Sequence, residues 1–458
     1  MGQNPPAATQ PDQAPVDDSS RTAPAAALSG IAGMQGESDA TDTGSQLPQI
    51  PALLGGTGIS SAFVSELERS NFLRGGLNVG AVYDSNAQLS SPAESNTSVS
   101  IFPNVRLEQS TSRMRYALSY AGGITINQNL PTQNQQAQNV NFDSQFRLSP
   151  HVNLRIAENF SYTTGLFDVG NGAGVVTGSG GPNASLIIPS ATQRSNLTTV
   201  ETNYHFALND LIGGSGSFYD LRFSNETSGS QVTNPLTDGQ NASASAFWLH
   251  HLFRGDWGGA SYHFDRITFD GGESLVHSFY AVNTLNLSNR FTLTAFVGPQ
   301  YAENQGIVPG ATLPSNSNNW SVAGGIEGGW QNQRTSVSGG YSRSISDGGG
   351  VLGSVRLGNV HANFRRELAP GWTGALTASH GTNQELIGPV GSASSINLTS
   401  AGVLIERNVG KSVGLRIGYT HDFQQEFGLS LPNPPTLDAH RNRVFVTLSY
   451  QWAKPLGI

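Results

Sequence analysis

Three histidines and one aspartate come closest to a catalytic or metal-binding group in this sequence. His250 and His251 are adjacent and follow Trp248, while His263 and Asp265 stand two residues apart. Neighbouring residues on a strand face opposite sides, so His250 and His251 cannot share a ligand, whereas His263 and Asp265 share a face. We interpret the adjacent pair as structural. A weak metal or acid–base cluster of His251, His263 and Asp265 stands as a third hypothesis, behind two others given below.

Other signatures of chemistry are missing from the sequence. It contains no cysteine, which excludes disulfides, thiolate catalysis and zinc–thiolate sites. No glycine-rich phosphate loop joins a strand to a helix, no basic run suits nucleic acid, and no Ser, His and Asp or Asn set stands out. We therefore predict that the protein is not an enzyme and has no catalytic residues, metal site, cofactor or nucleic-acid partner.

The last strand-like stretch, Arg443 to Trp452, gives the clearest structural signal. One of its faces would carry Arg443, Phe445, Thr447, Ser449 and Gln451, and the other Val444, Val446, Leu448, Tyr450 and Trp452. The apolar face ends in Tyr450 and Trp452, as expected where a lipid-facing strand reaches an aromatic girdle at the headgroup level. This pattern is typical of the strand that closes a transmembrane β-barrel.

Composition favours the same class of protein. Of the 458 residues only 12% are charged and 37% hydrophobic, while glycine numbers 55. No apolar run approaches the roughly 18 residues that a membrane helix needs. Low charge with sparse apolar residues fits a barrel, because lipid-facing positions alternate with polar lumenal ones.

The strand pattern repeats about 18 times between residues 73 and 452. Connections after even-numbered strands are tight, as at Ser149-Pro150 and Ala369-Pro370, whereas several after odd-numbered strands are long, as at 164–193 and 425–441. Outer-membrane barrels have this asymmetry of short periplasmic turns and longer outer loops. The sequence thus predicts an all-β fold, a transmembrane antiparallel up-and-down β-barrel of about 18 strands in the outer membrane of a Gram-negative bacterium. Its partners would be membrane lipid and the barrel-assembly machinery.

Four regions follow from this interpretation. Residues 1–58 are rich in Pro and Ala and lack periodicity, so we expect a disordered acidic periplasmic segment. Residues 59–72 would form a short helix or a linker at the barrel mouth, 73–452 the barrel, and 453–458 a C-terminal overhang. Residues 1–69 hold eight acidic and two basic residues, a net charge of −6 out of −8 for the whole chain.

Charged residues near the short turns are the candidate pore-lining set. With apolar residues placed outward, eight charged side chains fall on the inner face: Arg106, Glu108, Arg113, Arg115, Asp143, Arg147, Arg155 and Arg416. Fixed positive charge in a narrow aqueous pore attracts anions. The alternative is that these arginines pair with Glu108, Asp143 and neighbouring carboxylates and brace the wall. Lys411 and Arg407 are expected close to the same end.

Two further expectations concern the acidic segment and Glu158. The acidic segment would occupy or gate the basic periplasmic entrance, with a solubilising spacer or a docking arm for a periplasmic partner as alternatives. Glu158 falls on the outward phase between Ile156 and Phe160, and we expect a bulge or a different phase there.

One stretch carries a family resemblance. Gly76 to Asn86, with Tyr83-Asp84-Ser85-Asn86 at its end, resembles the first strand of outer-membrane β-barrel porins encoded beside exopolysaccharide gene clusters, where a Tyr-Asp-Asp-Asn-like motif is common. Pro103, Arg115-Tyr116 and Ser119-Tyr120-Ala121-Gly122 are similar to the family pattern too. The resemblance implies transport of an exported polysaccharide, with periplasmic secretion partners. The chain departs from it where Ala453 to Ile458 follow the final aromatic residue.

The first hypothesis for function is therefore an outer-membrane channel. It would be porin-like and pass hydrophilic, mainly anionic solutes, or by resemblance an exported polysaccharide. The alternative is a non-transporting outer-membrane barrel whose extracellular loops bind surfaces or partners.

Overall fold

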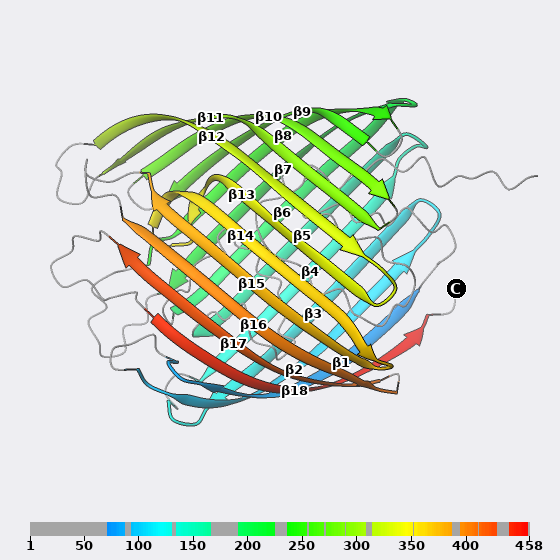
Figure 1. The fold of residues 1–458 in the computed structure, drawn as a ribbon, viewed down its shortest axis with the longest axis vertical. Helices are drawn as coiled ribbons and strands as arrows, with labels where there is room; N and C mark the ends of the chain where they lie inside the picture. Colours follow the sequence, from blue (N-terminus) through cyan, green and yellow to red (C-terminus); the bar gives the residue numbers. More distant parts are fainter. Residues whose placement is uncertain are drawn as a thin grey trace, which may run out of the picture.

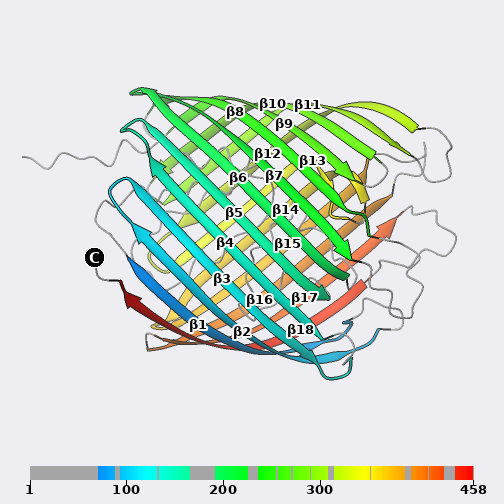
Figure 2. The same ribbon diagram turned by 180° about the vertical axis from the view of Figure 1, so that it is seen from behind.

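A computed structural model shows one closed barrel of 18 antiparallel strands (Figures 1 and 2). It describes residues 71–456 apart from 88–92, 131–133, 166–190, 225–235, 254–255, 270–271, 289, 308–313, 351, 387–393, 411 and 428–438. The expected N-terminal segment, residues 59–70 of the expected mouth helix or linker, and Lys411 lie outside the described residues, and Phe72 of that region already belongs to β1. The strands are β1 (Phe72–Asp84), β2 (Asn96–Ser110), β3 (Met114–Asn127), β4 (Gln135–Arg147), β5 (Val152–Gly165), β6 (Ala191–Ala207), β7 (Asp210–Ser224), β8 (Gly239–Phe253), β9 (Asp256–Phe269), β10 (Gly272–Ser288), β11 (Phe291–Ile307), β12 (Pro314–Gln331), β13 (Thr335–Gly348), β14 (Leu352–Ala369), β15 (Trp372–Glu385), β16 (Ser395–Val409), β17 (Val413–Phe427) and β18 (Ala439–Pro455).

The barrel closes through its first and last strands. Each strand pairs with its neighbours in the chain, and β1 pairs with β18 along its whole length, from Phe72 opposite Pro455 to Asp84 opposite Arg443. Closure supplies a partner for backbone N–H and C=O groups that an open sheet would leave unpaired in lipid. Among the described residues, no helix is long and apolar enough to cross a membrane.

The two faces of the wall differ as the sequence predicts. On β18 the side chains of Val446, Leu448 and Tyr450 are 43–52% exposed on the outside, whereas Phe445 and Thr447 on the inner face are 6% and 1% exposed. An apolar outer face on a closed barrel is suited to lipid. The fold is that of a Gram-negative outer-membrane β-barrel, and the predicted architecture of about 18 strands is confirmed.

The connections separate the two ends of the cylinder. The links after β2, β4, β6, β12 and β14 are turns of two to four residues at one end, and the C-terminal end of β18 lies on the same side (Figure 1). We call this the short-turn end and the opposite one the long-loop end. In outer-membrane barrels the short-turn end faces the periplasm.

Details of the strands differ from the sequence prediction at three places. Arg113 lies in the turn before β3 rather than on the strand. β18 continues to Pro455, so half of the expected overhang 453–458 belongs to the wall. No bulge occurs at Glu158, because the register of β5 is unbroken with both neighbours.

Glu158 itself therefore stays on the outer face. It stands opposite Phe142 and Thr198, and the Thr198 hydroxyl donates a hydrogen bond of 2.6 Å to its carboxylate. The outward phase read from the sequence was right, and the expected bulge was wrong. The carboxylate is tolerated because a neighbouring outward side chain supplies its donor.

The wall is split at one seam. β12 and β13 pair from Gln331 opposite Ser336 only as far as Gly324 opposite Arg343, eight pairs, whereas β11 and β12 pair over 17. Beyond this point β13 and β14 stay paired with each other but turn away from β12, as Figures 1 and 2 show at the long-loop end. Residues 314–323 of β12 thus have no ladder partner on the β13 side.

Candidate functional site

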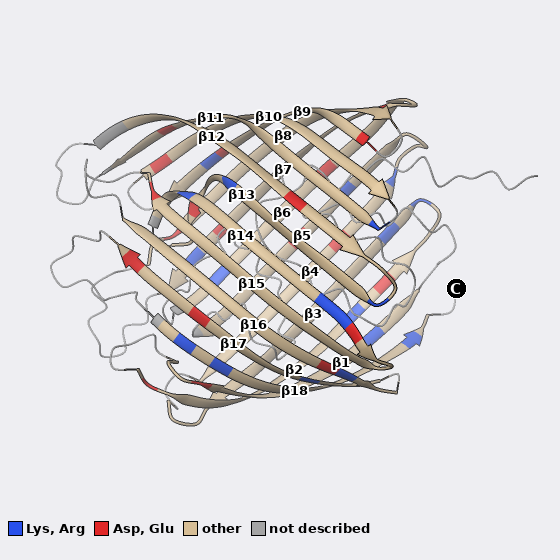
Figure 3. Ribbon diagram, viewed as in Figure 1, with Lys and Arg blue, Asp and Glu red and all other residues tan. Residues whose placement is uncertain are grey.

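Arginines and carboxylates lie close together on several strands near the short-turn end (Figure 3). Glu108 on β2 is held between two arginines. Arg106 Nε lies 2.7 Å from its carboxylate and Arg74 Nη2 of β1 lies 3.8 Å away, while the Glu108 side chain is only 8% exposed. Two of the predicted pore-lining residues, Arg106 and Glu108, are therefore an ion pair.

A second group joins β4, β5 and β6. Arg155 Nε donates a hydrogen bond of 2.9 Å to Asp143, and Arg155 Nη1 lies 3.5 Å from Glu201. The Arg155 side chain is 15% exposed and that of Glu201 4%. One guanidinium thus compensates two carboxylates, and sequence reasoning missed Glu201 although it falls on the inward phase of β6.

A third group lies across the barrel on β14, β16 and β17. Glu406 is 3.4 Å from Arg365 Nη2 and 3.6 Å from Arg416 Nη2. Nearby, His361 Nε2 is 3.1 Å from Glu327. Arg416 was predicted here, and the structure adds Glu406 and Arg365 to its group, with the pair of His361 and Glu327 further round the wall on β14 and β12.

The remaining predicted arginines are less enclosed. Arg115 lies on the inner face of β3 and is exposed, and no ion pair or hydrogen bond joins it or Arg113 to a carboxylate within the described part of the chain. Arg147 ends β4, and its backbone N–H donates to the Arg113 carbonyl at 2.7 Å. Arg407 lies at the short-turn end as expected, but over the Trp372 ring at 4.8 Å.

Arg407 is on the outer face because Val403 and Ile405, on the same phase of β16, point outward. It therefore belongs with the aromatic residues at the short-turn end. Tyr450 and Trp452, the predicted girdle pair, are 51% and 42% exposed on the outer face of the same end. Their role in a girdle stays a prediction.

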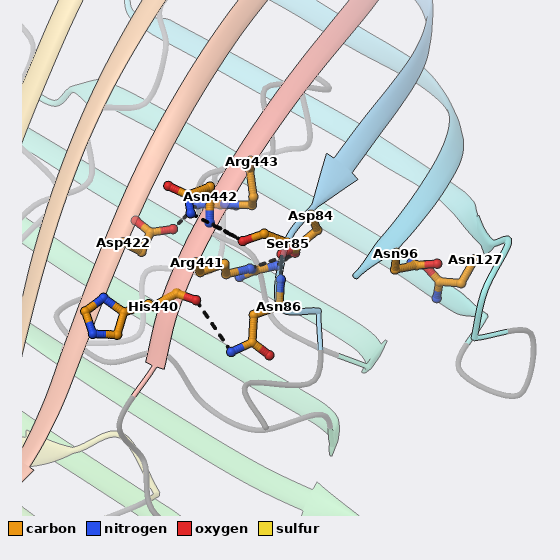
Figure 4. Close-up of polar contacts among 10 residues, drawn as sticks. All are labelled: Asp84, Ser85, Asn86, Asn96, Asn127, Asp422, His440, Arg441, Asn442 and Arg443. Atoms are coloured by element: carbon orange, nitrogen blue, oxygen red, sulfur yellow. Dashed lines mark hydrogen bonds and ion pairs between the residues drawn. The ribbon is translucent and has the colours of Figure 1, made fainter. Parts of the chain in front are cut away.

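The motif that carries the family resemblance lies at the opposite end of the closing seam (Figure 4). Asp84 accepts hydrogen bonds from Arg441, with a Nε–Oδ2 distance of 2.7 Å, and from the Asn86 backbone N–H at 3.0 Å. The Ser85 hydroxyl accepts from the Asn442 backbone N–H at 2.8 Å. Asp84 and Ser85 thus fasten β1 to β18, and the Asn86 side-chain amide donates to the His440 carbonyl at 3.5 Å.

The same corner holds a second buried ion pair. Arg443 Nη2 donates to Asp422 of β17 at 2.7 Å, and the two side chains are 5% and 6% exposed. Sequence reasoning missed Arg441 and Arg443 as partners. Their inward phase on β18, opposite the motif on β1, is the signal that could have found them.

The histidines fall into two separate places. His263 Nε2 is 3.0 Å from Asp265 on the inner face of β9, with both side chains buried. The His251 ring instead packs on Trp257, 4.9 Å between centroids. His250 contacts Asp210 at 2.9 Å from the outer face of β8. As predicted, His250 and His251 lie on opposite faces of β8, but His251 does not form a cluster with His263.

No group of three or more His, Cys, Asp or Glu side chains in the described ranges could hold a metal ion. The His263 pair is therefore limited to two residues, with His263 Nδ1 buried and lacking a partner within those ranges. Such a pair can position a proton but presents no third ligand.

An apolar stretch of the inner wall was not predicted. Seven buried residues from β7 to β12 form one cluster against which Phe247 packs: Leu211, Leu249, Trp257, Tyr280, Val282, Phe296 and Ala323. Aromatic residues on the inward phase are the signal that could have found it, but the usual assignment of apolar residues to the lipid side hides them. The inner face is thus charged over one part of its circumference and apolar over another.

The split hairpin lies inside the barrel at the long-loop end. Ile345 of β13 packs with Ile267, Val276 and Ala302 of the inner wall, and the Ser354 hydroxyl is 2.7 Å from that of Ser274 on β10. These contacts turn the outward face of β13 and β14 onto the inner face of β9, β10 and β11.

The tip of this hairpin reaches further round the wall. Thr237, just before β8, donates its backbone N–H to the Gly350 carbonyl at 2.8 Å. Gly350 has φ +83°, and a Cβ at this position would overlap the Phe223 ring. Only glycine fits, because both the backbone angle and the close approach exclude a side chain. The hairpin therefore takes up space within the long-loop half of the barrel.

Comparisons with known proteins show only distant structural likeness. No family model matches the sequence, and no curated protein matches it. Among solved structures, the unliganded ferric citrate transporter FecA has a TM-score of 0.45 at 8% identity, covering 85% of this chain and 80% of that one. OpdK of Pseudomonas aeruginosa with vanillate has a TM-score of 0.40 at 10% identity, covering 83% and 99%. The siderophore receptor PiuA of Acinetobacter baumannii has 0.44 at 8%, covering 84% and 82%.

Proposed function

We propose that the protein is an outer-membrane channel for small hydrophilic solutes. The observation that carries this proposal is a closed wall of 18 strands whose inner face bears charged groups that partly face solvent, such as Arg106, 43% exposed in its side chain, and Asp143, 34%. Barrels of this strand number are wide enough to leave an aqueous path, unlike barrels of eight strands. A path lined by polar side chains admits solutes that lipid excludes.

The size of the cargo is the next step of the proposal. The β13–β14 hairpin and its contacts with Ser274 and Thr237 narrow the long-loop half of the cylinder. We infer a limit that admits small solutes more readily than a polymer. An exported polysaccharide, which the family resemblance implies, is the second cargo, and it would need the hairpin to move.

Selectivity depends on how many arginines have partners. Glu108, Asp143, Glu201 and Glu406 compensate Arg74, Arg106, Arg155, Arg365 and Arg416, so these groups brace the wall more than they attract ions. We infer a modest anion preference that arises from Arg113 and Arg115 at the short-turn mouth. The pore-lining set consists of Arg106, Glu108, Arg113, Arg115, Asp143, Arg147, Arg155 and Arg416.

Single-channel recording of the refolded protein tests this function. We expect discrete conductance steps in a planar bilayer and a reversal potential of anion-preferring sign in a salt gradient. Arg113→Gln with Arg115→Gln should move the reversal potential toward zero, whereas the matched control Arg266→Gln, an outer-face arginine paired with Glu273, should not. If intact barrels carry no current, the channel is refuted and the long loops become the candidate binding surface.

Two further measurements separate the cargo and the acidic segment. Liposome swelling with sugars of increasing size should show a cut-off near a small oligosaccharide, while equal passage of long chains would favour polysaccharide transport. Deletion of residues 1–58 should increase conductance if the acidic segment gates the periplasmic entrance. Unchanged conductance and selectivity would leave it as a spacer or docking arm.

A further inference from the structure

Two histidines face each other across neighbouring strands at the short-turn end. The backbone N–H of His205, on β6, donates a hydrogen bond of 2.9 Å to the carbonyl of His151, which directly precedes β5. This bond continues the ladder in which Val152 stands opposite Tyr204. His151 and His205 are therefore a directly opposed cross-strand pair, and the Cβ atoms of such a pair are about 5 Å apart.

The pair lies on the inner face of the wall, at the short-turn mouth. His205 has the same phase on β6 as Glu201, and His151 has the same phase as Arg155 on β5. Glu201 and Arg155 contact each other on the inner face at 3.5 Å. The His151 side chain is exposed and that of His205 is half-buried, so solvent at the mouth reaches the pair.

The turn before β5 holds the backbone of His151 in place. The Ser149 hydroxyl accepts hydrogen bonds from the backbone N–H groups of His151 at 3.1 Å and Val152 at 3.0 Å. Pro150, between them, has a fixed φ. The backbone that carries this imidazole is thus ordered before any ligand binds, which lowers the entropy cost of binding.

The other eight of the ten histidines each have a partner for the ring. Six rings form a hydrogen bond with a neighbouring side chain and two pack on an aromatic ring: His250, His263, His277, His361, His380 and His421, and then His251 and His440. Within the described part of the chain, no hydrogen bond or ion pair involves the ring of His151 or His205. Their ring nitrogens are therefore available to a ligand.

We propose that His151 and His205 together bind one divalent transition-metal ion at the short-turn mouth. Neutral imidazole suits Zn²⁺, Cu²⁺ and Ni²⁺, and the metal–nitrogen distance is about 2.0–2.1 Å. Two such nitrogens on one ion are about 3 Å apart. Rings whose Cβ atoms are about 5 Å apart reach this separation by rotation about χ1 and χ2.

Two protein ligands make this a site for an exchangeable ion. Resident zinc sites have three or four protein ligands, and no group of three or more His, Cys, Asp or Glu side chains forms in the described ranges. Water would complete the coordination. The sequence analysis predicted no metal site, because only the register of β5 and β6 brings the two histidines together. The inference concerns ion binding and does not depend on whether the barrel conducts.

Binding of Cu²⁺ to the refolded full chain without an affinity tag tests the site. Affinity among divalent ions peaks at copper, so this ion is the most sensitive probe. We expect one ion per chain, with an electron paramagnetic resonance spectrum that shows coupling to two imidazole nitrogens. Linking two ligands raises affinity by about 10²–10⁴-fold over one alone, so His151→Gln and His205→Gln should each weaken binding about 100-fold.

The matched control is His380→Gln. His380 is exposed and its ring is hydrogen-bonded to Thr399 at 2.8 Å, so this variant should bind Cu²⁺ like the unchanged protein. Heat-dependent gel mobility verifies that each variant is a folded barrel. If His205→Gln is not folded, His151→Gln decides, because His151 is exposed in a turn.

Three results would overturn the site. The first is equal Cu²⁺ affinity of folded His151→Gln and the unchanged protein. The second is a spectrum that shows coupling to a single nitrogen. The third is an equal loss of affinity in His380→Gln, which would assign the ion to scattered surface histidines.

Discussion

The buried ion pair at the closing seam gives the sharpest prediction on stability. Arg441→Leu removes the guanidinium that contacts Asp84, leaving a carboxylate with a 9% exposed side chain whose remaining donor among the described residues is the Asn86 backbone N–H at 3.0 Å. Breaking a buried pair from one side costs about 3–5 kcal/mol. Because the Asn86 donor remains, we expect the lower end, a loss of about 3 kcal/mol in the free energy of unfolding.

A double-mutant cycle in micelles with urea measures this cost. Asp84→Asn in the Arg441→Leu background should recover about 1–2 kcal/mol, since it removes the stranded charge. The exposed pair Arg266–Glu273, with side chains 57% and 34% exposed, is the control, and its loss should cost at most about 1 kcal/mol. If Arg441→Leu costs no more than the loss of Arg266, the seam pair is solvated and the reasoning from burial fails.

Three other perturbations test the faces of the wall and the hairpin. Val446→Arg, on the outer face of β18, should cost about 2–4 kcal/mol in lipid, and a negligible cost would remove this face from the membrane. Glu158→Leu should raise the free energy of unfolding by about 1 kcal/mol, because the lipid-exposed outer face favours an apolar side chain, and a loss would show that the hydrogen bond from Thr198 outweighs this gain. Ser274→Cys with Ser354→Cys, whose hydroxyl oxygens are 2.7 Å apart, should cross-link in this cysteine-free chain without changing conductance. Loss of current on oxidation would show that the hairpin must move.

Much of the architecture was predictable because a barrel wall repeats one simple rule. Alternation on β18 predicted which side chains between Val444 and Trp452 point outward, and the short turns predicted which strands are neighbours. The same rule predicted the inner face of Arg106 and Arg155, and the alternative interpretation named Glu108 and Asp143 as their partners, but Glu201 was not predicted. Pairing depends on which residues face each other across strands, as Arg155 and Glu201 do, and a sequence read one strand at a time does not supply that register.

Features that break the rule were beyond sequence reasoning. Arg113 moved into a turn because strand ends depend on hydrogen bonds that alternation does not encode. The inward turn of β13 and β14 is hidden because Ile345 and Arg343 keep the outward phase while the backbone carries that face into the barrel. For Glu158 the outward phase predicted from the sequence was correct. The expected bulge was wrong because it assumed that no carboxylate can face lipid.

The eight-pair ladder between β12 and β13 also sets where the cylinder is weakest. In a closed sheet every strand is held from both sides, so rupture must begin at the seam with the fewest backbone hydrogen bonds. Those amides of β12 between Gly324 and Gln331 that bond to β13 should therefore exchange with solvent deuterium earlier than the amides of β12 that bond to β11. The same seam forms the fewest backbone hydrogen bonds when the barrel assembles. Packing of the β13–β14 hairpin on the inner wall therefore contributes as much as hydrogen bonds to holding the barrel together there.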